Sequence, residues 1–253
     1  NIPFEETINE MIKLKNKGII NHIGLCNFSY DQLFKLVKFF KKGVISSIQV
    51  EYNLFERSAE KKLANFCRKH DISIISYGPL AQGKLANGIK QLSILKKISK
   101  KYNCSISQLI LSWIASKKNF FSIPNSSSYE NLVNNFKSNN LILEKIDIKK
   151  IDEKCYTPIL KINTKKIQVT DNYNRKVYSS LEEAVENKMN MVPSPIELSK
   201  EIKQGNFLKP IRLKKIKKNK KIIYDLTEGR LRYWSWVIAY GWKKPIPSLV
   251  WEN

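Results

Sequence analysis

Residues 21–29, NHIGLCNFS, place a short apolar run directly before a serine that can cap a helix. The run predicts a buried strand, because a continuous apolar stretch of this length suits a strand covered on both faces. A Ser side chain accepts hydrogen bonds from the backbone N–H groups that begin a helix. The next residues carry Leu33, Leu36 and Val37 at helical spacing. This stretch therefore predicts a strand followed at once by a helix.

The same alternation recurs three times before residue 156. Further strands are predicted at residues 46–52 (SSIQVEY), 73–77 (SIISY) and 120–124 (FFSIP). The helices between and after them are expected to begin at Ser58, Ser105 and Ser128. Apolar strands that alternate with helices predict parallel βα units. A full eight-unit barrel takes about 250 residues, so we expect an α/β fold, either a partial (β/α)8 barrel of the TIM type with about four units or a small open sheet.

The pattern changes after residue 156. We expect a strand at 159–169, short helices at 180–188 and 194–205, a hairpin formed by 211–216 and 222–226, a helix at 230–240 and a last strand at 246–250. A segment of this size with its own strands and helices can form a separate small α+β domain. The sequence therefore predicts two domains, residues 1–156 and 157–253.

The chain is strongly basic, with 45 Lys and Arg against 22 Asp and Glu and a net charge of +23. Residues 1–156 hold 25 basic and 13 acidic side chains, which leaves +12 there and +11 in the rest. A nucleic-acid binder more often gathers its charge in one patch. A nucleic-acid partner therefore stays an alternative that we do not favour.

Apolar residues and cysteines restrict the class of protein further. No window approaches 18 consecutive apolar residues, so we expect no membrane span and no membrane partner. The four cysteines lie 41, 37 and 51 residues apart, which fits neither a CxxC metal site nor a dense disulfide framework. Reduced thiols of this kind indicate a cytoplasmic protein without a metal site.

Four motifs in the first domain resemble the aldo/keto reductase family. They are residues 18–29 (GIINHIGLCNFS), 49–53 (QVEYN), 76–83 (SYGPLAQG) and 123–128 (IPNSSS) followed by NNF at 134–136. The motifs occur in the family's order, cover residues 1 to about 153, and resemble its C-terminal half. The resemblance implies an NAD(P)-dependent oxidoreductase that acts on carbonyls or alcohols.

The resemblance also implies which residues contact the cofactor. Asn27 and Gln49 would bind the nicotinamide carboxamide, Tyr77 would stack on the nicotinamide ring, Leu80 would line the pyrophosphate, Ser126 would touch the adenosine phosphate, and Asn135 would contact the adenine. Asn125 and Asn131 are neutral where the family often has a basic residue for the 2′-phosphate. The expected cofactor is therefore NADP or NAD.

The family's catalytic Asp, Tyr, Lys and His lie in its first half. His22 and His70 do not match the position of its catalytic His. Carbonyl reduction needs a proton donor beside the hydride acceptor, so the resemblance implies a cofactor-binding half without catalytic residues, inactive alone. The first residue is Asn1 rather than Met, and we expect a fragment or a processed product.

The second domain is similar to the ParB/sulfiredoxin superfamily. The similarity rests on residues 205–211 (GNFLKPI), 224–233 (YDLTEGRLRY) and 247–250 (PSLV). It implies a binding site for a nucleotide or another phosphate, formed by Arg175, Gly229, Arg230 and Arg232. Three of these residues are arginines, which a chain with only six arginines would keep where a phosphate needs a forked contact. A sulfiredoxin activity is excluded because this motif carries no nucleophilic Cys.

Two functions remain open at this point. The first is an aldo/keto reductase-type oxidoreductase with a ParB-like module fused to it. The alternative is a ParB-like nucleotide-binding, kinase-like or DNA-associated protein in which the reductase half is a vestigial scaffold. In either case a half barrel has two open sheet edges, and we expect self-association through them.

Overall fold

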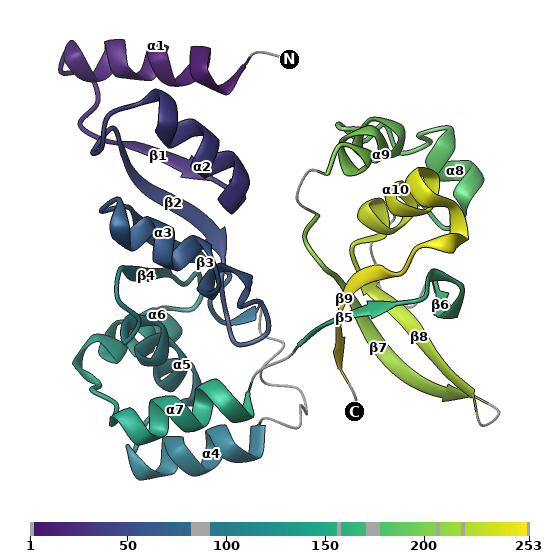
Figure 1. The fold of residues 1–253 in the computed structure, drawn as a ribbon. Helices are drawn as coiled ribbons and strands as arrows, with labels where there is room; N and C mark the ends of the chain where they lie inside the picture. Colours follow the sequence, from purple (N-terminus) through teal and green to yellow (C-terminus); the bar gives the residue numbers. More distant parts are fainter. Residues whose placement is uncertain are drawn as a thin grey trace. The chain divides into compact units, whose positions relative to one another are not determined.

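The computed structural model describes residues 3–81, 92–155, 158–170, 178–205, 208–218 and 221–251. The chain divides into two compact units, Asn1–Tyr156 and Thr157–Asn253. Each unit has its own sheet and helices (Figure 1), and each is described by itself below.

The first unit alternates strands and helices along the chain (Figure 1). Its elements are α1 (Phe4–Asn16), β1 (Ile23–Cys26), α2 (Tyr30–Phe39), β2 (Ile45–Glu51), the 3-10 helix η1 (Ser58–Glu60), α3 (Leu63–Lys69), β3 (Ser73–Tyr77), α4 (Leu92–Lys101), α5 (Ile106–Ala115), β4 (Phe120–Ile123), α6 (Tyr129–Phe136), η3 (Lys137–Asn140) and α7 (Lys145–Lys154). The strands form one parallel sheet in the order β1-β2-β3-β4. The predicted parallel βα units are confirmed.

Serine caps begin three of the helices as predicted. Ser29 and Ser105 each form a capping box, in which the serine side chain accepts from the third helical N–H and a Gln side chain accepts in return. Ser128 accepts from the N–H of Asn131 at the start of α6. The prediction for Ser58 was wrong, because this residue lies within η1 and α3 begins five residues later, after Lys62.

The two faces of the four-stranded sheet differ in burial. Side chains such as Ile48 and Ile74 are fully buried on one face. Residues between them in sequence, such as Gln49 and Ile75, point to the other face and stay partly exposed. On β4, Phe121 of that second face is 58% exposed. One face thus forms a core with the helices and the other does not.

The second unit is a mixed α+β arrangement. Its elements are β5 (Ile159–Ile162), η4 (Thr164–Lys166), β6 (Ile167–Gln168), α8 (Leu181–Val185), α9 (Pro195–Lys203), β7 (Ile211–Lys218), β8 (Lys221–Glu228), α10 (Arg230–Tyr240), η5 (Gly241–Lys243) and β9 (Ile246–Trp251). The sheet order is β5-β9-β7-β8-β6, with parallel and antiparallel pairs. The three helices gather on one side of these strands (Figure 1), and α10 packs against α8 and α9.

Most elements of the second unit match their predicted ranges, including the β7–β8 hairpin and α10. The predicted strand at 159–169 was wrong at residues 163–166, which are not in a strand. The Asn163 side chain accepts a hydrogen bond from the N–H of Lys165 at 2.9 Å, and this local bond starts the short helix η4. One predicted strand is therefore two, β5 and β6, which pair with different neighbours.

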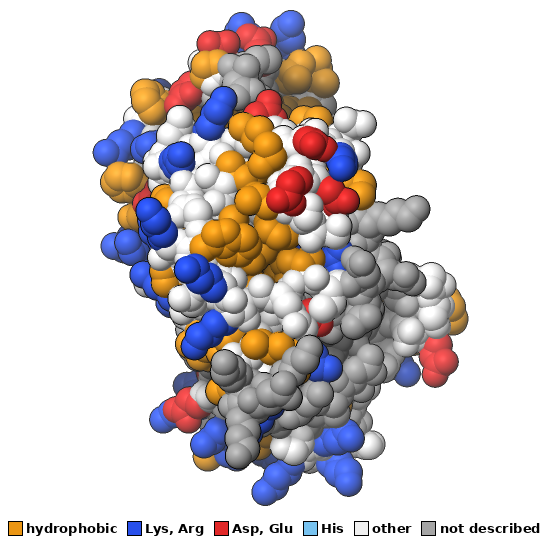
Figure 2. Space-filling model, turned by 90° about the vertical axis from the view of Figure 1, so that its right-hand side faces the viewer, with side chains coloured by type: hydrophobic (Ala, Val, Ile, Leu, Met, Phe, Trp, Pro, Cys, Tyr) orange, Lys and Arg blue, Asp and Glu red, His pale blue; other side chains and the backbone are white. Residues whose placement is uncertain are grey.

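The surface and the helices of the chain were also compared with the expectations from charge and hydropathy. On the face drawn in Figure 2, Lys and Arg side chains lie mainly towards the left and lower edges, and apolar side chains gather near the middle. None of the helices described here is long and apolar enough to cross a membrane.

Candidate functional site

Asn27, Gln49 and Tyr77 lie side by side at the carboxyl ends of β1, β2 and β3. The backbone N–H of Asn27 donates to the carbonyl oxygen of Gln49 at 2.8 Å. The Tyr77 hydroxyl donates to Oδ1 of Asn27 at 2.9 Å. Gln49 pairs in register with Ile75, two residues before Tyr77, so the Gln49 and Tyr77 side chains share one face. Asn27 is exposed and the other two are partly exposed.

The backbone at Asn27 explains how it reaches this position. Its φ is 59°, in the left-handed region that Asn adopts more readily than most residues. This turn ends β1 and redirects the chain to Ser29, which caps α2. The same residue therefore ends the strand and presents its amide at the strand tip.

Glu51 belongs to the same group, although the sequence analysis did not single it out. It pairs in register with Tyr77, and its Oε1 accepts from Nδ2 of Asn53 at 3.3 Å. Asn53 also donates to the carbonyl of Gly78 at 3.0 Å, which joins the loops after β2 and β3. Alternation along β2 could have found Glu51, since it lies two residues after Gln49 on the same face.

Leu80 lies in the turn after β3. Gly78 has a φ of 59°, which a residue with a side chain adopts less easily. The N–H of Ala81 donates to the Gly78 carbonyl at 3.0 Å and closes the turn. Leu80 is partly exposed there. The predicted motif continues to residues 82 and 83, which lie outside the described residues.

Ser126 and Asn135 lie near the start and the end of α6. Ser126 Oγ accepts from the N–H of Ser128 at 3.1 Å, which orders the loop that leads into the helix. Asn135 is only 8% exposed, and its carbonyl accepts from Ser138 Oγ at 2.6 Å. Burial leaves the Asn135 side chain little access to a ligand in solution.

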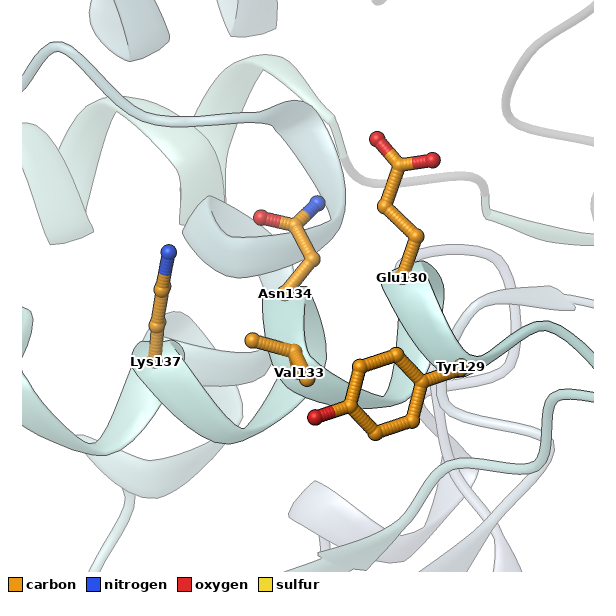
Figure 3. Close-up of a pocket in the computed structure, with 5 residues that line it drawn as sticks. All are labelled: Tyr129, Glu130, Val133, Asn134 and Lys137. Carbon is orange, nitrogen blue, oxygen red and sulfur yellow. The ribbon is translucent and has the colours of Figure 1, made fainter.

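A shallow pocket of about 340 Å³ runs along the exposed side of α6. It is lined by Tyr129, Glu130, Val133, Asn134 and Lys137 (Figure 3). Glu130 and Asn134 project to the same side of the helix (Figure 3), and Asn134 Nδ2 donates to Ser105 Oγ at 3.1 Å. None of the six predicted cofactor contacts lines this pocket.

Arg57 organises a buried charge network behind the loop that follows β2. Its Nε and one terminal nitrogen donate to Glu60 at 3.0 and 2.8 Å. The other terminal nitrogen donates to the Asp152 carbonyl at 2.9 Å. Asp152 Oδ1 also accepts from Trp113 Nε1 at 2.9 Å. The network therefore ties the loop after β2, which also holds Asn53, to α7.

In the second unit, two of the four residues predicted for a phosphate site, Arg230 and Arg232, donate to backbone carbonyls. Gly229 has a φ of 100° directly before α10. One Arg230 nitrogen donates to the Thr170 carbonyl, and Arg232 donates to the carbonyls of Lys209 and Pro210 at 2.9 and 2.8 Å. Arg175 lies outside the described residues.

The sequence analysis missed two basic residues that interact with Glu228, the residue before Gly229: Arg212 and Lys209. Arg212 is 1% exposed and forms an ion pair with Glu228 at 3.1 Å. Burial, with the positive charges of Arg232 and Arg212, lowers the pKa of Lys209 to about 8. Arg212 could have been suspected, because it is one of only six arginines in a lysine-rich chain. Within the described residues, no three His, Cys, Asp or Glu side chains could hold a metal ion.

Comparison with known proteins gives matches over the first unit. The chain is 31% identical over 152 residues to aldose reductase C of Dictyostelium discoideum, covering 60% of this chain and 45% of the relative. It is 30% identical over 133 residues to methylglyoxal reductase YeaE of Escherichia coli, covering 52% of this chain and 47% of the relative. The chain spans about half the length of the curated relatives it matches.

A solved structure agrees with this match. The aldo/keto reductase of Klebsiella pneumoniae in complex with NADP and acetate shares 28% identity and a TM-score of 0.55, covering 60% of this chain and 54% of its own. The profile of the aldo/keto reductase family matches residues 1–155. The motifs, the parallel βα units and these matches agree, and the chain belongs to the aldo/keto reductase family.

Proposed function

We propose that the first unit binds a nicotinamide dinucleotide, NADP or NAD, at the carboxyl ends of its strands. In this proposal it is the cofactor-binding part of an oxidoreductase acting on carbonyls or alcohols. The contact of Tyr77 with Asn27, beside Gln49, carries the proposal. An aromatic ring can hold a planar nicotinamide, and two amides can satisfy its carboxamide. The Klebsiella pneumoniae relative, solved with NADP, supports this choice.

The adenosine end of the cofactor would extend towards α6. Leu80 and Ser126 are the contacts that the family resemblance implies for the pyrophosphate and the adenosine phosphate. Asn134 lines the pocket on α6, whereas Asn135 is 8% exposed. We therefore assign the adenine to the face of α6 that carries Asn134 rather than to Asn135.

The bound nicotinamide would supply the hydride for carbonyl reduction, and this chain's residues would orient the ring. The proton donor that the reaction also requires is not among the family contacts matched here. The function proposed for this unit is therefore cofactor binding.

Fluorescence titration of the full chain with NADPH, NADH and ATP tests the proposal. NADPH or NADH should quench the intrinsic fluorescence with a saturable curve, and ATP should not compete at equal concentration. Gln49→Leu removes the amide at similar volume and should weaken the dinucleotide about tenfold, since lost polar contacts cost about 1 kcal/mol or more. Gln204→Leu, at an exposed position in the second unit, should leave binding unchanged. Equal affinity in both variants would contradict the assignment.

We also propose a second function, the binding of a phosphate or nucleotide by the ParB-like second unit near Gly229. The buried position of Lys209 beside Arg232 and Arg212 favours it. Burial is the main cause that lowers the pKa of Lys209, and the positive charges of the two arginines lower it further. If this site carries the activity, the first unit is a scaffold and the protein is nucleotide-binding, kinase-like or DNA-associated.

Proton uptake tests this second function. An anion bound near Lys209 raises its pKa, so binding should take up protons between about pH 8 and 9. Calorimetric titration with ATP, CTP or phosphate in two buffers of different ionisation enthalpy measures this uptake. Lys209→Met should remove it, whereas Lys203→Met, at an exposed position, should not. No heat with any of these anions would refute the site.

A further inference from the structure

Three basic side chains of the second unit gather around a single carboxylate. Arg212 of β7 and Arg232 of α10 approach the carboxylate of Glu228, with nitrogen–oxygen distances of 3.1 and 3.9 Å. Lys209 lies in the segment before β7, and the charges of the other three side chains all act on the pKa of its amine. We call Lys209, Arg212, Glu228 and Arg232 the basic cluster. It holds three positive charges and one negative charge.

The guanidinium of Arg232 is held in one place. Its Nη1 donates to the carbonyl oxygens of Lys209 and Pro210 at 2.9 and 2.8 Å. The guanidinium also lies against Gly229, where an added Cβ atom would meet Nη2 of Arg232 at 3.1 Å and Cζ at 3.2 Å. Gly229 has a φ of 100°, so glycine permits both the turn and this close approach. The bond to the Lys209 carbonyl fixes the backbone that carries the lysine.

The members of the basic cluster differ in exposure. Arg212 is 1% exposed, and the side chains of Glu228 and Arg232 are 14% and 17% exposed. Lys209 is partly exposed. Because Arg212 is enclosed, a ligand from solution would reach the cluster at Lys209 and Arg232. There it would meet an amine and a forked guanidinium.

The surroundings of Lys209 favour the neutral form of its amine. Burial is the main cause that lowers its pKa to about 8; Arg232 and Arg212 lower it further, and Glu228 acts in the opposite direction. An ordinary lysine has a pKa of about 10.4. At pH 8 about half of the Lys209 side chains therefore carry a neutral amine. A neutral amine has a lone pair that can attack a carbonyl carbon.

We propose that Lys209 forms an imine with aldehydes or ketones that also carry a phosphate or carboxylate group, and that Arg232 binds this anionic group. The amine lone pair attacks the carbonyl carbon, and a carbon–nitrogen bond forms. The carbonyl oxygen gains one proton from the amine nitrogen and one from solvent, and it leaves as water. The product is a protonated imine. The step is reversible and needs no oxidant or reductant.

The charge of the basic cluster decides why the ligand should be anionic. A protonated imine keeps a positive charge on the lysine nitrogen, close to two arginines and one carboxylate. A neutral aldehyde leaves this excess positive charge unchanged, whereas a phosphate or carboxylate offsets it. A guanidinium also binds such a group through two parallel hydrogen bonds.

The inference rests on the second proposed function in one respect, that an anion binds near Gly229. It goes beyond that function because it adds a covalent bond between Lys209 and a carbonyl compound, and because it needs no nucleotide. The two can therefore fail separately.

Reductive trapping on the full chain tests the proposal. The probe is pyridoxal 5′-phosphate, which carries an aldehyde and a phosphate. It is added at pH 8 with sodium cyanoborohydride, which reduces an imine to a stable amine, and peptide mass spectrometry measures the label on each lysine. Lys209 should be labelled at least about tenfold faster than Lys203, an exposed lysine of α9, because more of its amine is neutral at this pH.

Pyridoxal, which lacks the phosphate, is the matched probe. The ratio of the Lys209 rate to the Lys203 rate corrects for the different reactivity of the two aldehydes. This ratio should be at least about fivefold smaller with pyridoxal, since a hydrogen bond to a charged group is worth about 1 kcal/mol or more.

Two variants identify the nucleophile. Lys209→Arg keeps the positive charge and removes the amine, so it should abolish the saturable part of the imine absorption that pyridoxal 5′-phosphate produces. Lys203→Arg makes the same change at an exposed position and should leave this absorption unchanged.

Three results would overturn the proposal. If Lys209 is labelled no faster than Lys203, no imine is favoured there; heat from phosphate binding in the calorimeter would then leave the second proposed function standing alone. If both probes give the same ratio, the anionic group has no role. If the saturable absorption persists in Lys209→Arg, another lysine is the nucleophile.

Discussion

The Tyr77 hydroxyl donates to Oδ1 of Asn27 at 2.9 Å, across fifty residues of sequence. The bond joins the ends of β1 and β3, the two strands on either side of β2. On β2, the Gln49 carbonyl accepts from the Asn27 backbone N–H. The hydroxyl thereby holds the ring of Tyr77 beside the amide. In the proposed cofactor site, a nicotinamide stacked on this ring would lie beside the amide of Asn27.

The ring and the hydroxyl of Tyr77 should be separable by mutation. Tyr77→Phe keeps the stacking surface and loses one partly exposed hydrogen bond, worth about 1 kcal/mol or less. Dinucleotide affinity should fall no more than about fivefold. Tyr77→Ala removes the ring and should reduce affinity at least tenfold, measured by NADPH titration. An unchanged affinity in Tyr77→Ala would disprove the stacking role.

The four cysteines should differ in reactivity. Cys26 is exposed at the end of β1, whereas burial raises the pKa of Cys67 and of Cys155 to about 12 and raises that of Cys104. Only thiolates react rapidly, so brief treatment with iodoacetamide should label Cys26 first. Mass spectrometry of the peptides would measure this, and bound dinucleotide should slow the labelling. Faster labelling of Cys67 than of Cys26 would contradict the burial of Cys67.

Because of Asp147, the stability of the first unit should depend on pH in the acid range. Its carboxylate is 2% exposed and accepts from Lys101, Lys150 and Tyr102 at 2.7, 3.0 and 3.0 Å. The hydrogen bond from Lys101 is the main cause that lowers its pKa to about 2. Because the folded pKa is below the unfolded value of about 4, the stabilisation is present at neutral pH and is lost as the pH falls from about 4 to 2.

The variant Asp147→Asn isolates this contribution. It should destabilise the first unit by about 2 kcal/mol at pH 7 and flatten the pH dependence between 4 and 2, as measured by urea unfolding. Glu144→Gln removes an exposed ion pair to the same lysine and should change stability by less than about 0.5 kcal/mol. If both variants lowered the free energy of unfolding equally, the larger contribution assigned to the buried Asp147 would be contradicted.

Arg57 should resist replacement by lysine. Its guanidinium is buried. Nε and Nη2 donate to Glu60, Nη1 donates to the Asp152 carbonyl, and Nη2 also donates to the Asp152 carboxylate. A lysine cannot make this forked contact, so Arg57→Lys should cost about 2 to 4 kcal/mol. Arg68→Lys, which affects an exposed contact to Asn65, is the matched control and should be near neutral. Thermal unfolding of the two variants measures the difference.

Local patterns in the sequence predicted much of this protein. The capping serines Ser29, Ser105 and Ser128, the four strands and the β7–β8 hairpin follow from interactions within a few residues, so sequence alone determined them. The family motifs named Asn27, Gln49 and Tyr77 in advance, and the structure places them together. Patterns failed where another local bond was stronger, as at Asn163, which interrupts a predicted strand.

Only the tertiary structure decided which distant residues meet. Strand register places Glu51 beside Tyr77, and helix packing brings Asp152 to Arg57 across 95 residues. Folding also placed the Arg230 and Arg232 donors on backbone carbonyls and buried Asn135. Sequence by itself determines the propensity and periodicity of each segment, because these depend on neighbours along the chain. Contacts between segments depend on how sheets and helices pack, and that geometry exists only in the folded chain.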